Sequence, residues 1–291
     1  MGRWIGGGSR SVLWAAMCLG AMVSGGQAQE VINLPNDYQL GFQEAVTPNM
    51  VDITWMHNDI LMPIITVITI FVLALLLWVM VRFNSRTNPT PSRTTHNTTV
   101  EVVWTVVPII ILVGMAIPSF KILYSQLEIP EADMTIKATG HQWYWSYEYP
   151  DHGDIAFDSI MLEDDERSAD QPRLLAVDNP VVVPAGATVR VQVTASDVIH
   201  NWAMPAFGNK IDAIPGRLNE TWFKVDKPGI YYGMCSELCG SRHAFMPIEV
   251  RVVPQADFDT WLEGARAEFA AAPEVENDGK TRTAAVSRTA Q

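Results

Sequence analysis

The sequence predicts a two-helix transmembrane hairpin followed by a single all-β domain. Two apolar runs, each long enough to cross a bilayer, lie before residue 125. Beyond them, up to about residue 254, short β-branched and aromatic runs alternate with Pro-Gly and Ala-Gly turns. This pattern is typical of an antiparallel sandwich or barrel of about 125 residues.

Residues 1–28 have the layout of an export signal. Arg3 and Arg10 precede a short apolar core, "SVLWAAMCLGAMV", and Ala28 ends a small-residue motif that suits signal peptidase. The alternative is a first membrane anchor, but the apolar core is too short to span a bilayer comfortably. Cleavage after Ala28 would leave residues 29–57 as an N-terminal extracytoplasmic segment.

The two long apolar runs predict membrane-spanning helices over residues 58–84 and 98–124. The core of the first, "ILMPIITVITIFVLALLLWVMVRF", would be about 36 Å long as an α-helix, which is enough to span with some tilt. The second contains Pro108 and Pro118. Prolines are tolerated in membrane helices where neighbouring helices satisfy the freed carbonyls, so we expect partners within the membrane.

The loop between these helices sets their orientation. Residues 85–97 carry Arg86 and Arg93 and no acidic residue, so the positive-inside rule makes this loop cytoplasmic. On the other side the flanks are acidic, with Asp52 and Asp59 before the first helix. Both ends of the mature chain, and the β domain, are therefore expected on the outer side, in agreement with the export signal.

The β domain is expected over residues 128–254 and is acidic. Between residues 128 and 251 it carries 19 Asp and Glu against 10 Lys and Arg. Such a surface repels nucleic acid and favours a basic partner, although ordinary solubility explains the charge equally well. Apolar residues at helical spacing predict an amphipathic helix over 255–272, and the composition of 273–291 predicts a disordered tail.

The stretch "YYGMCSELCGSRHAFM" concentrates the reactive residues of the chain. After export only Cys235 and Cys239 remain, and in an oxidising compartment a disulfide is the main alternative. Their neighbours favour metal instead, because His243 and Met246 follow in the same loop and His200 ends an upstream strand. Structural zinc would take two thiolates and two imidazoles, whereas a thioether favours copper. Two thiolates could bridge two coppers, which would also prevent a disulfide.

The ligand motif resembles that of a known family. With "GHQWYW" upstream and two membrane helices, the chain resembles subunit II of bacterial cytochrome c oxidase over roughly residues 30–270. The resemblance implies an all-β cupredoxin-like Greek-key barrel that holds a binuclear copper centre, CuA. The side-chain ligands that it implies are His200, Cys235, Cys239, His243 and Met246. It also implies that Glu237 binds copper through its backbone carbonyl, and magnesium or manganese through its carboxylate, at the boundary with subunit I.

Further roles follow from the same resemblance. Trp143 matches the tryptophan that passes electrons from docked cytochrome c. Without the resemblance, an aromatic ladder on one strand face is the simpler interpretation, with Trp143, Trp145, Tyr147 and Tyr149 in line. Four carboxylates correspond to residues that meet the lysines of cytochrome c, although each alone is an ordinary surface charge: Glu148, Asp158, Asp178 and Asp197.

Glu101 lies at the start of the second membrane helix. With Thr98 it forms the sequence "TTVE", which predicts a capping box. An ionisable residue at a membrane boundary is also a candidate for proton uptake. In the family that the chain resembles, the matching glutamate lies at the entrance of a proton path into subunit I, and the two roles are compatible.

The resemblance implies a subunit of a proton-pumping oxidase in the bacterial inner membrane, with both termini periplasmic. Electrons from cytochrome c would reach CuA and then a haem in subunit I, where oxygen is reduced to water; other oxidase subunits are expected as partners. There are four alternatives to this interpretation. The intact copper ligand set argues against the related quinol oxidase subunit, and the chain has no room for the second metal domain of nitrous oxide reductase. A membrane-anchored copper-binding or chaperone protein with no part in respiration, and a structural β domain with a plain disulfide, are the other two.

Overall fold

The computed structural model describes residues 31–269, except residues 36 and 154, so the predicted signal peptide and tail lie outside the described residues. The helical segments are α1 (Pro48–Trp55), a π-helical turn η2 (Met56–Leu61), α2 (Met62–Arg82), α3 (Thr98–Leu127) and α4 (Gln255–Phe269). The strands are β1 (Val31–Asn33), β2 (Met134–His141), β3 (Tyr144–Tyr149), β4 (Ile155–Ser159), β5 (Val181–Pro184), β6 (Thr188–Ala195), β7 (His200–Met204), β8 (Asn209–Ala213), β9 (Asn219–Lys224), β10 (Gly229–Cys235) and β11 (Pro247–Val253). Short 3-10 turns are η1 (Asp37–Gln39), η3 (Pro150–His152), η4 (Pro205–Phe207) and η5 (His243–Phe245).

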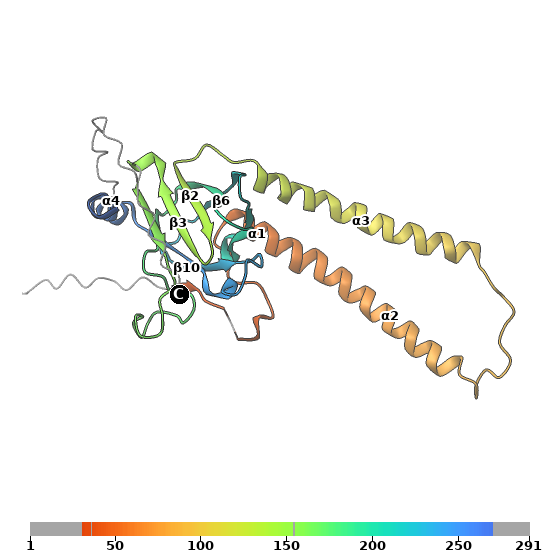
Figure 1. Ribbon diagram of the computed structural model, residues 1–291. Coiled ribbons are helices and arrows are strands. Elements are labelled where there is room, and N and C mark those ends of the chain that lie inside the picture. The colour runs from red at the N-terminus through yellow and green to blue at the C-terminus, as the bar shows by residue number, and fades with distance from the viewer. Residues whose placement is uncertain (1–30, 36, 154, 270–291) are drawn as a thin grey trace, which may run out of the picture.

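The predicted fold class is confirmed: two helices long and apolar enough to cross a membrane precede a β domain of cupredoxin type. Figure 1 shows α2 and α3 running away from the β domain and joined at their far ends, while α4 packs on the opposite side of the domain. The elements α1, η2 and α2 form one helical run over Pro48–Arg82. This run is longer than the predicted helix, because it begins at Pro48 rather than near residue 58. Thr47 caps this start by accepting a hydrogen bond from the backbone N–H of Met50 at 3.1 Å.

The start of α3 differs from the predicted capping box. Asn97, not Thr98, is the N-cap, and its side-chain oxygen accepts a hydrogen bond from the backbone N–H of Val100 at 3.2 Å. Thr98 is already the first helical residue, so Glu101 lies one position too late to complete a box with Asn97. Asparagine and threonine both suit an N-cap, which is why the sequence alone did not separate them.

The β domain consists of two sheets with mixed strand directions, and the prediction of a purely antiparallel domain is wrong. One sheet has the order β5-β11-β10-β7-β8, with β1 added beside β10, and the other has the order β4-β3-β2-β6-β9. The pairs β2–β6, β5–β11 and β1–β10 are parallel. Partners in a parallel pair need a long connection rather than a tight hairpin, and each of these pairs joins strands far apart in sequence.

The aromatic run "HQWYWSYEY" is not one continuous strand. β2 ends at His141, the chain turns at Gln142 and Trp143, and β3 begins at Tyr144. Trp145, Tyr147 and Tyr149 alternate inward on β3 and are buried in the core, as the period of two requires. Trp143 is therefore not a member of the predicted ladder but belongs to a turn at the edge of the domain.

Polar contacts fasten the helical hairpin to the β domain. Thr47 donates its hydroxyl proton to the carbonyl of Phe207 at 2.6 Å, and the side-chain amide of Gln126 donates to the carbonyl of Gly208 at 3.1 Å. Gly208 has a positive φ of 73°, and a Cβ there would lie 2.9 Å from Ile53. These contacts surround η4, which directly follows β7, so the segment after the strand that begins at His200 is joined to the start of α1 and the end of α3.

Candidate metal centre

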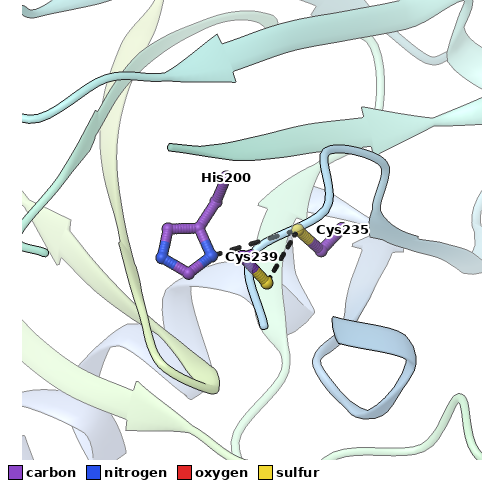
Figure 2. A group of neighbouring side chains, drawn as sticks. All are labelled: His200, Cys235 and Cys239. Atoms are coloured by element: carbon purple, nitrogen blue, oxygen red, sulfur yellow. Dashed lines mark hydrogen bonds between the residues drawn. The ribbon is translucent and has the colours of Figure 1, made fainter. Parts of the chain in front are cut away.

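Three elements bring the predicted ligands together. His200 is the first residue of β7, and Cys235 is the last residue of the neighbouring strand β10. Cys239 lies in the loop that follows, and Met246 immediately precedes β11. Figure 2 shows His200 and the two cysteines pointing toward one another from the strand end and the loop. The rigid sheet therefore positions one end of the site, and a single loop of the chain supplies the rest.

The donor atoms converge on the two thiols. The Sγ atoms of Cys235 and Cys239 are 3.8 Å apart, and neither cysteine forms a disulfide. His200 Nδ1 lies 4.0 Å from Cys235 Sγ, and His243 Nδ1 lies 3.5 Å from Cys239 Sγ. Met246 Sδ also lies 3.5 Å from Cys239 Sγ. Each thiol thus has one imidazole beside it.

A weaker donor accompanies each thiol as well. The backbone carbonyl oxygen of Glu237 is 3.3 Å from Cys235 Sγ. The thioether of Met246 is the corresponding weaker donor beside Cys239. The carboxylate of Glu237 belongs to an exposed residue of the loop. Among the described residues, His200, Cys235 and Cys239 form a cluster able to hold a metal ion, with donor atoms all within 4.8 Å of one another. Such soft donors suit copper.

Burial and hydrogen bonding shift the pKa values of the two thiols in opposite directions. Burial alone would raise the pKa of the Cys235 thiol, but hydrogen bonds from His200 and neighbouring backbone groups lower that pKa to about 7. Burial raises the pKa of the Cys239 thiol, and the adjacent Cys235 raises it further. The pair therefore ionises easily once but resists a second ionisation. A bound cation would remove this resistance, since coordination stabilises the thiolate.

Glycines allow the backbone to approach the site closely, a feature that the sequence did not predict. A Cβ on Gly140 would lie 2.8 Å from the His200 ring. A Cβ on Gly233 would lie 2.1 Å from the carbonyl oxygen of Ala203, where β10 meets β7. The signal was available in part, because Gly140 opens the motif "GHQWYW", but only the fold brings it against His200.

Trp143 lies against the ligand loop. Its indole N–H donates to the carbonyl oxygen of Cys239 at 3.3 Å, and the side-chain amide of Gln142 donates to the same oxygen at 2.8 Å. Gly240 accommodates this approach, with a positive φ of 128° and space that a Cβ would take from the Trp143 ring at 2.9 Å. Gln142 is a second residue that the sequence did not single out.

The four predicted docking carboxylates differ in their surroundings. Glu148 pairs with Lys137 at 2.7 Å, and Asp158 accepts a hydrogen bond from the Ser146 hydroxyl at 2.6 Å. Asp178 accepts the backbone N–H of Ile160 at 2.7 Å. Asp197 differs from these three, because it accepts a hydrogen bond from a predicted ligand, His200 Nε2, at 2.8 Å.

Glu101 is not part of this site. It lies in the first turn of α3, at the end of the hairpin away from the β domain, and is partly exposed (Figure 1). The structure therefore separates the predicted residues into a cluster in the β domain and a single glutamate at the far end of a membrane helix.

Comparison with known proteins identifies the family. The family model for the periplasmic domain of cytochrome c oxidase subunit II matches residues 134–253, and that for the transmembrane domain of the same subunit matches residues 35–122. The probable cytochrome c oxidase subunit 2 of Rickettsia bellii is 55% identical over 228 residues, which cover 78% of this chain and 84% of the relative. The cytochrome c oxidase subunit 2 of Cereibacter sphaeroides is 45% identical over 272 residues, which cover 87% of this chain and 89% of the relative.

Among solved structures, the periplasmic domain of subunit II of cytochrome oxidase of Bradyrhizobium japonicum is 62% identical. It matches 49% of this chain and 100% of that chain, with a TM-score of 0.47. The two family models together account for both the membrane helices and the β domain. The resemblance predicted from the metal-ligand motif is therefore confirmed, and this chain belongs to the cytochrome c oxidase subunit II family.

Proposed function

We propose that this chain is the electron-accepting subunit of a respiratory cytochrome c oxidase. Single electrons from cytochrome c would arrive at a binuclear CuA centre in the β domain and pass to a haem in subunit I, where oxygen is reduced to water and protons are pumped. The observation that carries the proposal is the convergence of two free thiols, two imidazoles and a thioether.

The arrangement of donors favours two metal positions over one. Each thiol has an imidazole and a weaker donor within 4.0 Å: His200 and the Glu237 carbonyl beside Cys235, and His243 and Met246 beside Cys239. A single tetrahedral zinc ion would use four of these donors and leave the thioether and the carbonyl without a role. When bound, a copper pair held by Cys235 and Cys239 together with these neighbouring donors would supply a one-electron carrier.

The protein residues around these donors fit electron transfer rather than catalysis on a bound substrate. His200 and Met246 are almost fully buried, which excludes water and holds the donors in one geometry. Trp143 is partly exposed and donates a hydrogen bond to the Cys239 carbonyl, so it offers a short connection from the surface to a ligand. We propose Trp143 as the point at which electrons arrive.

We propose that the acidic surface docks cytochrome c. Glu148, Asp158, Asp178 and Asp197 are the carboxylates that would meet its lysines. Ser146 on β3 lies opposite Asp158 on β4 and donates a hydrogen bond to its carboxylate. This bond fixes the position of the Asp158 carboxylate on the proposed docking surface. Complementary charge would chiefly raise the association rate and make it depend on salt.

Two glutamates would connect the chain to subunit I. The exposed carboxylate of Glu237 would bind magnesium or manganese at the shared boundary, because these hard cations prefer oxygen ligands. Glu101 would lie at the entrance of a proton path. This assignment places α2 and α3 in the bacterial inner membrane, with both termini of the mature chain periplasmic and other oxidase subunits alongside.

The test uses the full chain, purified in detergent with its thiols kept reduced until copper is added, and then oxidised so that the copper pair has lost one electron relative to two Cu(I) ions. We expect two coppers per chain and an electron paramagnetic spectrum in which one unpaired electron is shared between two copper nuclei. A matched Cys239→Ser variant should lose the shared signal, because one of the two thiolates that would hold the copper pair is removed. One copper per chain, or a Cys235–Cys239 disulfide without copper, would overturn the proposal.

Expression in a bacterial host that makes the other oxidase subunits tests the assembly. A subunit of the oxidase should bring haem with it through purification, whereas a membrane-anchored copper-binding or chaperone protein should not. Haem absorbance per chain in the purified material separates these two functions directly.

A further inference from the structure

Asp197 has both carboxylate oxygens engaged inside the protein. Its Oδ1 accepts hydrogen bonds from His200 Nε2 at 2.8 Å and from the backbone N–H of Val198 at 2.6 Å. Its Oδ2 accepts the backbone N–H of Gln142 at 2.7 Å. The side chain is 32% exposed, while that of His200 is fully buried. This carboxylate thus lies between a predicted copper ligand and the turn that joins β2 to β3.

The same turn reaches the other end of the donor set. The Gln142 side chain donates to the carbonyl oxygen of Cys239 at 2.8 Å, and Trp143 donates to that oxygen at 3.3 Å. Gly240 permits this contact, because a Cβ there would lie 3.1 Å from the Gln142 amide nitrogen. One dipeptide is therefore bonded through its backbone to Asp197 and through its side chains to the ligand loop.

We propose that Asp197 and Gln142 are positioning residues for the metal centre. Together they form a bracket, His200–Asp197–Gln142–Cys239, that fixes the ligand on β7 relative to the ligand loop. The two ends of this bracket come from sequence positions 39 residues apart, and the Gln142 turn lies far from both. The inference rests on the proposed function in one respect, namely that the metal held is a copper pair.

The bracket also selects the form of the imidazole that can bind metal. Because Nε2 donates its proton to Asp197, a neutral His200 carries its free lone pair on Nδ1, the atom that faces Cys235 Sγ. A carboxylate behind a ligating imidazole also makes that ligand more basic, and such outer partners typically affect metal affinity by about 10- to 100-fold.

This role separates Asp197 from the other acidic residues of the proposed docking surface. Glu148 provides the matched comparison, because it is also an acid of that surface but pairs with Lys137 rather than with a ligand. If Asp197 served only to attract cytochrome c, neutralising either residue would change the salt dependence of docking and leave the copper centre as it was.

The test compares the full chain in detergent with four variants: Asp197→Ala, Asp197→Asn, Gln142→Met and Glu148→Gln. The readouts are the copper dissociation constant by competition with a chelator, the copper hyperfine pattern and the reduction potential. We expect Asp197→Ala to bind copper about 10- to 100-fold more weakly, with a changed hyperfine pattern and a higher potential. The potential should rise because the lost carboxylate favoured the more positively charged oxidised state.

The other variants should change copper binding by smaller amounts or not at all. Asp197→Asn should keep only half of the bracket, since the amide oxygen can still accept from His200 but the NH₂ group cannot accept from Gln142; an intermediate loss is expected. This variant also preserves the side-chain shape, so it serves if Asp197→Ala fails to fold. Gln142→Met should act in the same direction but less, because Trp143 still donates to Cys239, and Glu148→Gln should match the parent in all three readouts.

Two failures are distinguishable. Copper affinity, hyperfine pattern and potential of both Asp197 variants equal to those of the parent would overturn the bracket and leave Asp197 as a docking charge. A parent chain that binds metal without the shared-electron spectrum would overturn the proposed function, while the dissociation constants of the variants would still decide whether the bracket holds the site.

Discussion

Replacing Gly140 with alanine tests whether the frame around His200 is as tight as the structure indicates. The new Cβ would lie 2.8 Å from Cδ2 of the His200 ring, about 0.6 Å inside the ordinary contact distance of 3.4 Å. The ring is fully buried, Asp197 bonds to its Nε2, and Cys235 Sγ lies 4.0 Å from its Nδ1, so moving the ring away from the new Cβ would disturb these neighbours. Gly140 pairs with Trp145 on one side and Ala195 on the other, so its own backbone is fixed as well.

Forcing extra volume into such a packed position typically costs about 1–3 kcal/mol. We therefore expect Gly140→Ala to reduce the free energy of unfolding of the β domain by about that amount. Displacement of the imidazole should also change the copper hyperfine pattern. Urea denaturation of the full chain in detergent, followed by near-ultraviolet circular dichroism, measures the first effect, and paramagnetic resonance of the copper-bound chain measures the second.

Gly264→Ala provides the control for this substitution. Gly264 lies in α4, and a Cβ there would meet no atom within 4 Å. Alanine is preferred to glycine in a helix interior by about 0.5–1 kcal/mol, so this variant should be slightly more stable than the parent and spectroscopically identical to it. If Gly140→Ala is as stable as Gly264→Ala and keeps the parent spectrum, the frame around His200 is looser than we infer.

Three further predictions concern a ligand, the electron path and a buried acid. Met246→Leu should cost less than about 1.5 kcal/mol of stability, because the volumes are similar, but should alter the copper spectrum by removing the thioether beside Cys239; an unchanged spectrum excludes Met246 as a ligand. Trp143→Phe should slow electron uptake from cytochrome c in stopped-flow measurements, while cytochrome binding stays near that of the parent and the copper spectrum changes no more than in Gln142→Met, because Gln142 still donates to Cys239; equal rates would leave Trp143 a packing residue. Glu249 is buried, and burial raises its pKa above the ordinary value of 4.5 despite the nearby Arg251. The folded chain then holds this proton more tightly than the unfolded chain, so stability should fall as the pH rises from about 4.5 through the folded-state pKa. Urea denaturation across this range should give a smaller fall for Glu249→Gln, and identical pH profiles would contradict the assignment.

The parts of the fold that the sequence predicted well depend on local composition. Long apolar runs identify membrane helices by length alone, and the cysteines, histidine and methionine of the ligand loop lie within a few residues of one another. Their spacing therefore carried the metal motif without knowledge of the tertiary structure. His200 lies 35 residues before Cys235, so spacing alone could suggest it as a ligand but could not place it beside the thiols.

The errors arose where distant segments decide the local structure. The alternating pattern of "HQWYWSYEY" continues through Gln142 and Trp143 as though the strand did not end there. What places these two residues in a turn is their bonding to Asp197 and to Cys239, about 55 and 97 residues further along the chain. Parallel pairing between β2 and β6 was unpredictable for the same reason, because periodicity specifies which face is buried but not which strand lies alongside.

The residues that sequence reasoning missed share one property that bears on function. Gly140 and Gly240 mark places where a side chain would collide with a ring beside the proposed metal centre, and Gly233 marks one where it would collide with the backbone of β7. Gln142 was also missed, and Asp197 was assigned only to docking; both make hydrogen bonds that connect the same segments. A centre that only gains and loses an electron needs no space for a substrate, but it does need donors that keep their positions in both oxidation states. Close backbone packing and the bracket of Asp197 and Gln142 keep the donors in place. Disrupting either should therefore change the copper spectrum and reduction potential first, and the stability of the domain to a lesser extent.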